Sequence, residues 1–201
     1  MSIAEISGYA AGVILTIGLV IYLVAIVMGK VSSNRVTWGI WILVNILLFF
    51  SYYELNGIVT SIWVPLVYLF GVVAIFLFLL KFGEPGYWSW VEKVALVGVS
   101  LIFILWFIYQ SPLATLTFTL LIDILGAIPL IVTVWKNPRA DYAPAWYLGF
   151  VANVLNLFAI EQWDYANASY PIYLALLTLI VATLIRFPLF LRPHVSANTT
   201  F

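Results

Sequence analysis

One carboxylic acid, Asp123, lies in the middle of a long apolar stretch, next to Leu121, Ile122 and Ile124. An ionisable side chain in such a stretch is costly unless it faces a cavity or a polar partner. Asp123 is therefore the first candidate for a functional residue, as a group that pairs with a ligand or takes up and releases a proton. The alternative is a structural acid that is hydrogen-bonded to a Trp, Tyr or Asn side chain of a neighbouring helix.

Two asparagines, Asn45 and Asn153, also lie inside apolar stretches. Each side-chain amide offers two donors and an acceptor oxygen, which suits the hydroxyl or amide groups of a ligand. Trp41, Asn45 and Tyr52 fall on one helical face, and Asn153 with Asn156 repeats that stripe. These residues and Asp123 form the predicted substrate-binding pocket. The alternative is that the asparagines hydrogen-bond between packed helices.

Pro129 is a candidate gating residue. It follows Asp123 by six positions and Gly126 by three, so all three lie on nearly the same side of one predicted helix. Proline removes a backbone hydrogen bond from a helix interior, which allows the helix to bend around a pocket. A static kink is the alternative.

Other chemistries have little support. The chain has no cysteine, which excludes disulfides and thiol catalysis, and His194 is its only histidine. We therefore expect no metal site, no cofactor and no enzymatic activity. The formal net charge is zero, so the chain carries no overall field that would attract nucleic acid.

The composition is that of an integral membrane protein, with the lipid bilayer as its solvent. Hydrophobic residues make up 65% of the 201 residues and charged residues only 8%, against about 25% charged in a soluble domain. A spanning helix needs roughly 20 mainly apolar residues. The sequence predicts an all-α protein with seven transmembrane helices, near residues 8–28, 36–54, 58–80, 90–109, 112–135, 144–162 and 169–191.

The positive charges predict the orientation. All lysines and arginines fall in alternate loops or at the end of the last helix, and the opposite loops carry Glu54, Glu161 and Asp164. Positive residues near helix ends stay on the cytoplasmic side. We expect the N-terminus outside and the C-terminus in the cytoplasm, in the plasma membrane of a bacterium or archaeon. Trp38 and Trp146 begin their helices on the cytoplasmic side, where we expect them to be interface anchors.

The chain pairs with itself at a shift of 108 positions, which aligns Gly18 with Gly126, Trp38 with Trp146, and Asn45 with Asn153. This predicts two parallel three-helix repeats joined by a linker helix, with a cavity between the halves near the midplane. The expected divisions are the first repeat at 1–82, the linker helix at 83–110, the second repeat at 111–192 and a cytoplasmic tail at 193–201.

This 3+1+3 layout, with an asparagine in the second helix of each triplet, resembles the SWEET and PQ-loop superfamily of small transporters. The segments that carry the resemblance run from Tyr22 to Tyr53 and from Ile128 to Gln162. The Pro-Gln dipeptide is absent, and Pro129 is the only proline at the position that SWEET proteins use in both triplets. The stretch from Asn34 to Trp41 is also similar to uncharacterised bacterial membrane proteins of this layout, and faintly to PnuC-type vitamin-precursor transporters.

The resemblance implies a facilitator or proton-coupled carrier of a small polar solute, such as a sugar or a vitamin precursor, which often self-associates into a homo-oligomer. The alternatives are a seven-helix receptor or sensor that does not transport, and a structural subunit of a membrane complex. A covalent retinal protein is excluded, because its Schiff base needs a lysine in the last helix and the segment from Tyr170 to Ile185 contains none.

Overall fold

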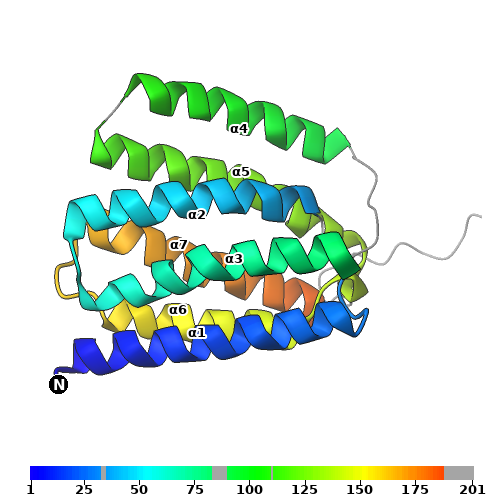
Figure 1. Ribbon diagram of the computed structural model, residues 1–201, viewed down its shortest axis with the longest axis horizontal. Coiled ribbons are helices and arrows are strands. Elements are labelled where there is room, and N and C mark those ends of the chain that lie inside the picture. The colour runs from blue at the N-terminus through cyan, green and yellow to red at the C-terminus, as the bar shows by residue number, and fades with distance from the viewer. Residues whose placement is uncertain (33–34, 83–89, 110, 188–201) are drawn as a thin grey trace, which may run out of the picture.

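The computed structural model describes residues 1–32, 35–82, 90–109 and 111–187. Within them the chain forms seven α-helices and two short 3₁₀ helices (Figure 1). In chain order these are α1 Ile3–Val27, α2 Arg35–Asn56, η1 Thr60–Ile62, α3 Trp63–Phe82, α4 Trp90–Ile108, α5 Pro112–Lys136, η2 Pro138–Ala140, α6 Ala143–Phe158 and α7 Tyr165–Arg186. The expected all-α architecture is confirmed.

Six of these helices are long and apolar enough to cross a membrane, and α6 is the exception. It has 16 residues, about 24 Å at 1.5 Å per residue, against a hydrocarbon layer of about 30 Å. The sequence predicted a helix over 144–162. The helix ends at Phe158 because the chain tightens there, where the Ala159 N–H bonds to the carbonyls of Asn156 and Leu157.

Capping residues explain two further differences in the helix boundaries. Helix α1 begins at Ile3 rather than near residue 8, because Ser2 and Glu5 form a capping box. Helix α7 begins at Tyr165 rather than at residue 169, because the Asp164 side chain accepts from the Asn167 N–H. Of the predicted linker, residues 83–89 and 110 lie outside the described residues, as does the tail with Arg192 and His194.

The helices form an antiparallel bundle (Figure 1), and the described lysines and arginines lie at one end of it. That end, on the right of Figure 1, holds the ends of α1, α3, α5 and α7 and the starts of α2, α4 and α6. We call it the basic end. The described lysines and arginines there are Lys30, Arg35, Lys81, Lys93, Lys136, Arg139 and Arg186.

The packing of the helices follows a regular scheme. Helix α1 packs on α6 and α3, α2 on α5 and α3, and α7 on α6 and α5. Helix α4 lies at the edge of the bundle and packs chiefly on α5 (Figure 1). Six helices therefore surround the interior, and α4 stands outside it.

Glycines allow two of these helix pairs to approach closely. A Cβ added at Gly18 of α1 would lie 3.1 Å from the Leu148 Cβ of α6. A Cβ added at Gly126 of α5 would lie 3.1 Å from Ile40 Cγ2 of α2. Small residues at such crossings bring backbones together, which is how helices associate in lipid.

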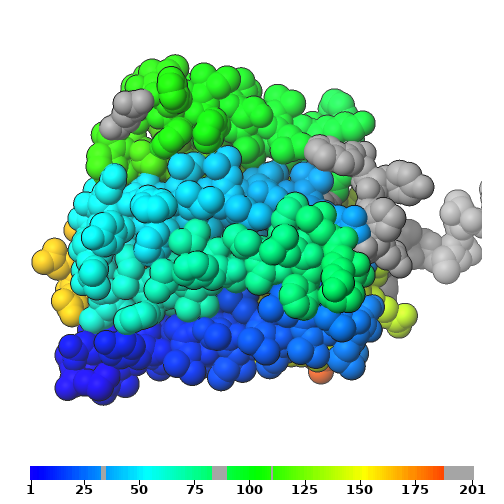
Figure 2. All heavy atoms as spheres, in the orientation of Figure 1, coloured from blue at the N-terminus to red at the C-terminus, as the bar shows by residue number. Residues whose placement is uncertain are grey.

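The outer surface is apolar, as expected where the solvent is lipid. In Figure 2, side chains of α1, α2 and α3 fill the spaces between neighbouring helices on one face. On α1, Val13, Ile17, Val20 and Val24 recur at helical spacing and are each about half exposed. Such a stripe would be unfavourable in water and is ordinary against acyl chains.

Candidate functional site

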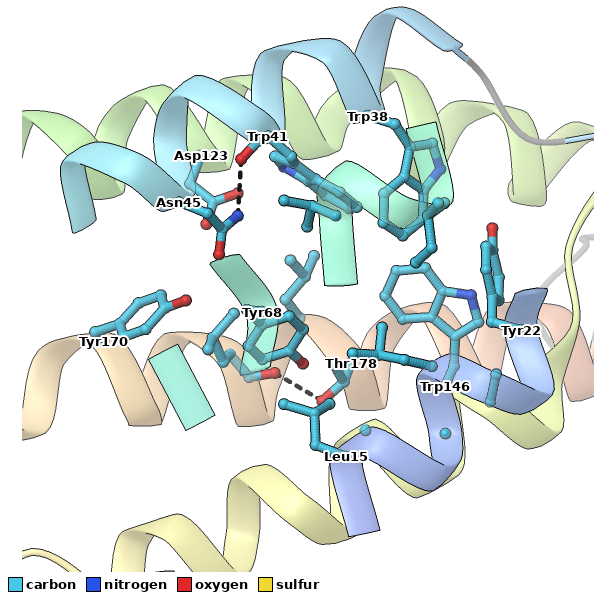
Figure 3. A pocket seen from close by; sticks show the side chains of 18 residues that line it. Leu15, Tyr22, Trp38, Trp41, Asn45, Tyr68, Asp123, Trp146, Tyr170 and Thr178 are labelled. Carbon is cyan, nitrogen blue, oxygen red and sulfur yellow. Dashed lines mark hydrogen bonds between the residues drawn. The ribbon is translucent and has the colours of Figure 1, made fainter. Parts of the chain in front are cut away.

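An interior cavity of about 70 Å³ lies where six helices meet (Figure 3). Its walls come from α1, α2, α3, α5, α6 and α7, and all lining residues except Leu19 and Tyr68 are buried. The lining residues are Leu15, Gly18, Leu19, Tyr22, Trp38, Trp41, Asn45, Tyr68, Val72, Ile75, Asp123, Ala145, Trp146, Gly149, Tyr170, Leu174, Leu177 and Thr178.

Four aromatic rings line the cavity on the side of the basic end (Figure 3), and we call them the aromatic cluster: Tyr22, Trp38, Trp41 and Trp146. The Trp38 ring centroid lies 5.3 Å from that of Tyr22 and 4.9 Å from that of Trp41. The Trp146 centroid lies 6.4 Å from both Tyr22 and Trp41. Trp38 and Trp146 are thus buried in the interior, whereas the sequence indicated interface anchors. Each ring lies near the start of its helix and points into the bundle (Figure 3).

Asp141 joins the aromatic cluster to the start of α6. Its carboxylate accepts hydrogen bonds from the Tyr22 hydroxyl at 3.0 Å, from Trp146 Nε1–H at 2.9 Å and from the Tyr142 backbone N–H at 2.7 Å. Only 5% of Asp141 is exposed. Because Tyr22 belongs to α1 and Trp146 to α6, this carboxylate ties the two helices together.

Asp123 lines the cavity from near the middle of α5 and is 3% exposed. The Tyr173 hydroxyl and the Trp41 indole N–H lie close enough to interact with its carboxylate. Neither group makes a hydrogen bond of standard geometry, so both are buried donors without an acceptor. An ionised carboxylate only accepts, so these two donors are suited to it.

Asn45 presents a bare oxygen in the cavity. Its Nδ2 donates to the Trp41 carbonyl oxygen one turn earlier, at 2.8 Å. Because that carbonyl only accepts, the amide nitrogen must face it, and Oδ1 is the atom that points inward (Figure 3). Oδ1 is buried and has no hydrogen-bond partner.

Asn153 lies behind the cavity wall instead of lining it. Its Nδ2 donates to the Tyr68 hydroxyl at 3.1 Å and to Thr178 Oγ1 at 3.4 Å, and both acceptors line the cavity. Asn153 therefore acts between α6, α3 and α7, which is the interhelical alternative of the sequence analysis.

The structure brings together three of the predicted pocket residues, Trp41, Asn45 and Asp123. Tyr52 does not line the cavity, and its hydroxyl pairs with Ser61 Oγ. Asn156 is fully buried outside the cavity, and neither atom of its amide has a partner. Pro129 is buried inside α5, which continues through it.

Five polar residues at or beside the cavity were not predicted: Tyr22, Tyr68, Asp141, Tyr170 and Thr178. Single hydroxyls in apolar stretches are too common to stand out in a sequence. Asp141 lies in a predicted loop, where an acidic residue is usually expected to be solvated or to cap a helix. Only the fold shows that it is buried against two helices.

The chain matches no known protein-family model, no curated protein and no solved structure. Among the described residues, no three His, Cys, Asp or Glu side chains lie together in a way that could hold a metal ion. The cavity offers one carboxylate, one bare amide oxygen, hydroxyls and aromatic faces, which is a set for binding.

Proposed function

We propose that the protein is a SWEET-like membrane carrier that moves a small solute through this cavity. The observation that carries the proposal is the position of Asp123, a buried carboxylate on the wall of an interior cavity at the meeting point of six helices. An ionisable group held inside a membrane segment is expensive, and facing a solute pathway is a common reason for one.

The helix contacts support the two-repeat architecture of the proposal. With α1, α2 and α3 set against α5, α6 and α7, each contact has a counterpart: α1 with α6 and α5 with α2, α1 with α3 and α5 with α7, and α2 with α3 and α6 with α7. Two related triplets that exchange their second helices would produce this pattern. In transporters built from repeats, the binding site lies at the interface between them.

Two of the close glycine contacts, those of Gly18 and Gly126, obey the same relation. Gly18 faces Leu148 and the Gly149 nitrogen, whereas Gly126 faces Ile40 and Trp41. A shift of 108 positions converts Gly18 into Gly126, Ile40 into Leu148, and Trp41 into Gly149. The residues at corresponding positions thus meet corresponding neighbours, which supports a repeat beyond the matched residue types.

The aromatic cluster is the proposed gate on the basic side. A carrier must close one side of its site while the other is open. The cluster lines the cavity on that side, and Asp141 bonds to Tyr22 of α1 and Trp146 of α6. Release of these hydrogen bonds would let α1 and α6 separate at that end. At the opposite end, Thr60 Oγ1 donates to the Ala159 carbonyl at 2.6 Å, a contact that would have to open in turn.

The proposal is tested by uptake into liposomes that contain the purified protein. Labelled sugars, amino acids, vitamin precursors and small amines are screened with and without a proton gradient. Saturable uptake above that of empty liposomes supports a carrier. Saturable binding without uptake would favour the receptor alternative, and the absence of both would favour a structural subunit.

A further inference from the structure

The cavity contains one carboxylic acid and no basic side chain. Asp123 is the single Asp or Glu among the lining residues, which include no Lys, Arg or His. In the described part of the chain, Asp123 has no ion-pair partner. The basic residues gather at the basic end, and Lys136 follows Asp123 by 13 positions, about 20 Å along α5. A buried carboxylate of this kind lacks a counter-charge.

The cavity that Asp123 lines has several aromatic walls. Trp38, Trp41, Tyr68, Trp146 and Tyr170 all line the cavity, and they come from four different helices. The face of an aromatic ring carries partial negative charge and attracts a cation within about 6 Å of its centroid. Aromatic rings on several sides of a cavity favour an organic cation, in which methyl or methylene groups surround the charged nitrogen.

The cavity has room for a small organic cation. A volume of about 70 Å³ corresponds to roughly five to seven water-sized groups, at about 10–15 Å³ for each. This matches a nitrogen that carries several methyl groups, or a short primary amine.

The available oxygens disfavour a bare metal cation. Hard cations such as Ca²⁺ and Mg²⁺ take six or more oxygen ligands. The acceptors in this cavity are the Asp123 carboxylate, the bare Asn45 Oδ1 and a few hydroxyls, and most of the remaining wall is apolar. An organic cation needs fewer oxygens, because its carbon atoms contact the rings.

We infer that the cavity binds a small organic monocation, a quaternary ammonium or a protonated amine, with Asp123 as the counter-charge and the aromatic rings as its walls. For a protonated amine, Asn45 Oδ1 accepts one of its N–H groups. This inference rests on the proposed function for the route of the cation through the membrane, and it names the class of solute.

The test is equilibrium binding to the purified full-length protein in detergent, measured by isothermal titration calorimetry. Tetramethylammonium is compared with tert-butanol, a neutral molecule with the same number of heavy atoms, and methylammonium tests the amine form. We expect saturable binding of a cation at least ten-fold tighter than that of tert-butanol. Equal binding of the neutral molecule, or no saturable binding of either cation, overturns the inference.

Two variants locate the binding. Asp123→Asn should weaken cation binding at least ten-fold and leave tert-butanol unaffected, and Glu161→Gln, an exposed acid in a loop, should change neither. Unchanged cation binding in Asp123→Asn contradicts the inference. If this variant does not fold, the comparison of the ligands on the wild-type protein still decides.

The binding test and the uptake test can fail independently of each other. Cation binding without uptake by liposomes would contradict the carrier and leave the inference intact. Uptake of a neutral solute by a protein that does not bind the cations would support the carrier and overturn the inference.

Discussion

Asp141 is the residue whose loss should most disturb the basic end. In Asp141→Ala, the Tyr22 hydroxyl, the Trp146 Nε1–H and the Tyr142 backbone N–H lose the carboxylate that accepts their hydrogen bonds. A buried donor left without an acceptor costs roughly 1–3 kcal/mol. Denaturant unfolding in detergent should therefore show a loss of stability of about this size. Tyr22→Phe, which removes one donor cleanly, should cost less. Equal stability of Asp141→Ala and wild type would contradict the role of this carboxylate.

Asp164 should give the stability of α7 a pH dependence. Hydrogen bonds from the Asn167 backbone N–H and side chain hold the pKa of this exposed N-cap carboxylate below its ordinary value of 3.8. The stabilisation is present above that value and is lost as the pH falls through the lower folded-state pKa. Asp164→Asn still caps the helix but does not titrate. Melting temperatures in detergent should therefore fall less on acidification in this variant than in wild type, and an identical fall would contradict the prediction.

At the residue scale, the sequence predicted part of the site because lipid makes polar residues conspicuous. Asp123 and Asn45 stood out against apolar neighbours, and both line the cavity. Asn153 stood out equally, yet it binds Tyr68 and Thr178 behind the wall. The direction of one side chain around a helix in an apolar stretch depends on which helices surround it, and hydrophobic periodicity is weak where lipid and core are both apolar.

Among the elements, the crossing of α1 with the η1 turn depends on the absence of a side chain at Gly8. A Cβ there would lie 2.1 Å from the Thr60 carbonyl oxygen, which is backbone and cannot swing aside. Gly8→Ala should destabilise the protein by about 1–3 kcal/mol, the usual cost of overpacking.

The control for Gly8→Ala is Gly39→Ala, in the interior of α2. A Cβ there would meet Phe76 Cε2 at 3.4 Å, an ordinary contact. Since alanine favours a helix by about 1 kcal/mol over glycine, Gly39→Ala should be neutral or stabilising in the same denaturant assay. Equal losses of stability in the two variants would show that the close contact at Gly8 is not the cause of the destabilisation.

The number and order of the helices could be predicted because each apolar stretch is bounded by polar, glycine or proline residues. The residues at which the helices begin and end were less predictable. Ser2 and Asp164 cap their helices from outside the most apolar stretches, so α1 and α7 begin earlier than hydropathy indicates. The early end of α6 at Phe158 follows from a tightened last turn, which apolar residues do not reveal.

For the whole molecule, the gathering of the basic residues predicts that the basic end faces the cytoplasm. The chain has no native cysteine, so single cysteines report position without background. A cysteine at exposed Glu161 should react with a membrane-impermeant maleimide on intact cells. A cysteine at exposed Lys81 should react only after the membrane is opened. The reverse pattern would invert the proposed orientation.

The proposed carrier depends on the one carboxylate that lines its cavity, Asp123. If Asp123 pairs with the solute or with a coupling proton, its charge is needed in every transport cycle, whereas a purely structural acid would affect only stability. The asparagine variant keeps the size of the side chain, and its folding can be checked by its melting temperature.

The most direct measurement is therefore the initial rate of solute uptake by liposomes that contain wild type, Asp123→Asn or Glu161→Gln, with the solute identified by the screen. We predict at least a ten-fold loss, or a loss of response to the proton gradient, in Asp123→Asn, and an unchanged rate in Glu161→Gln. A folded Asp123→Asn variant that transports at the wild-type rate would contradict the account.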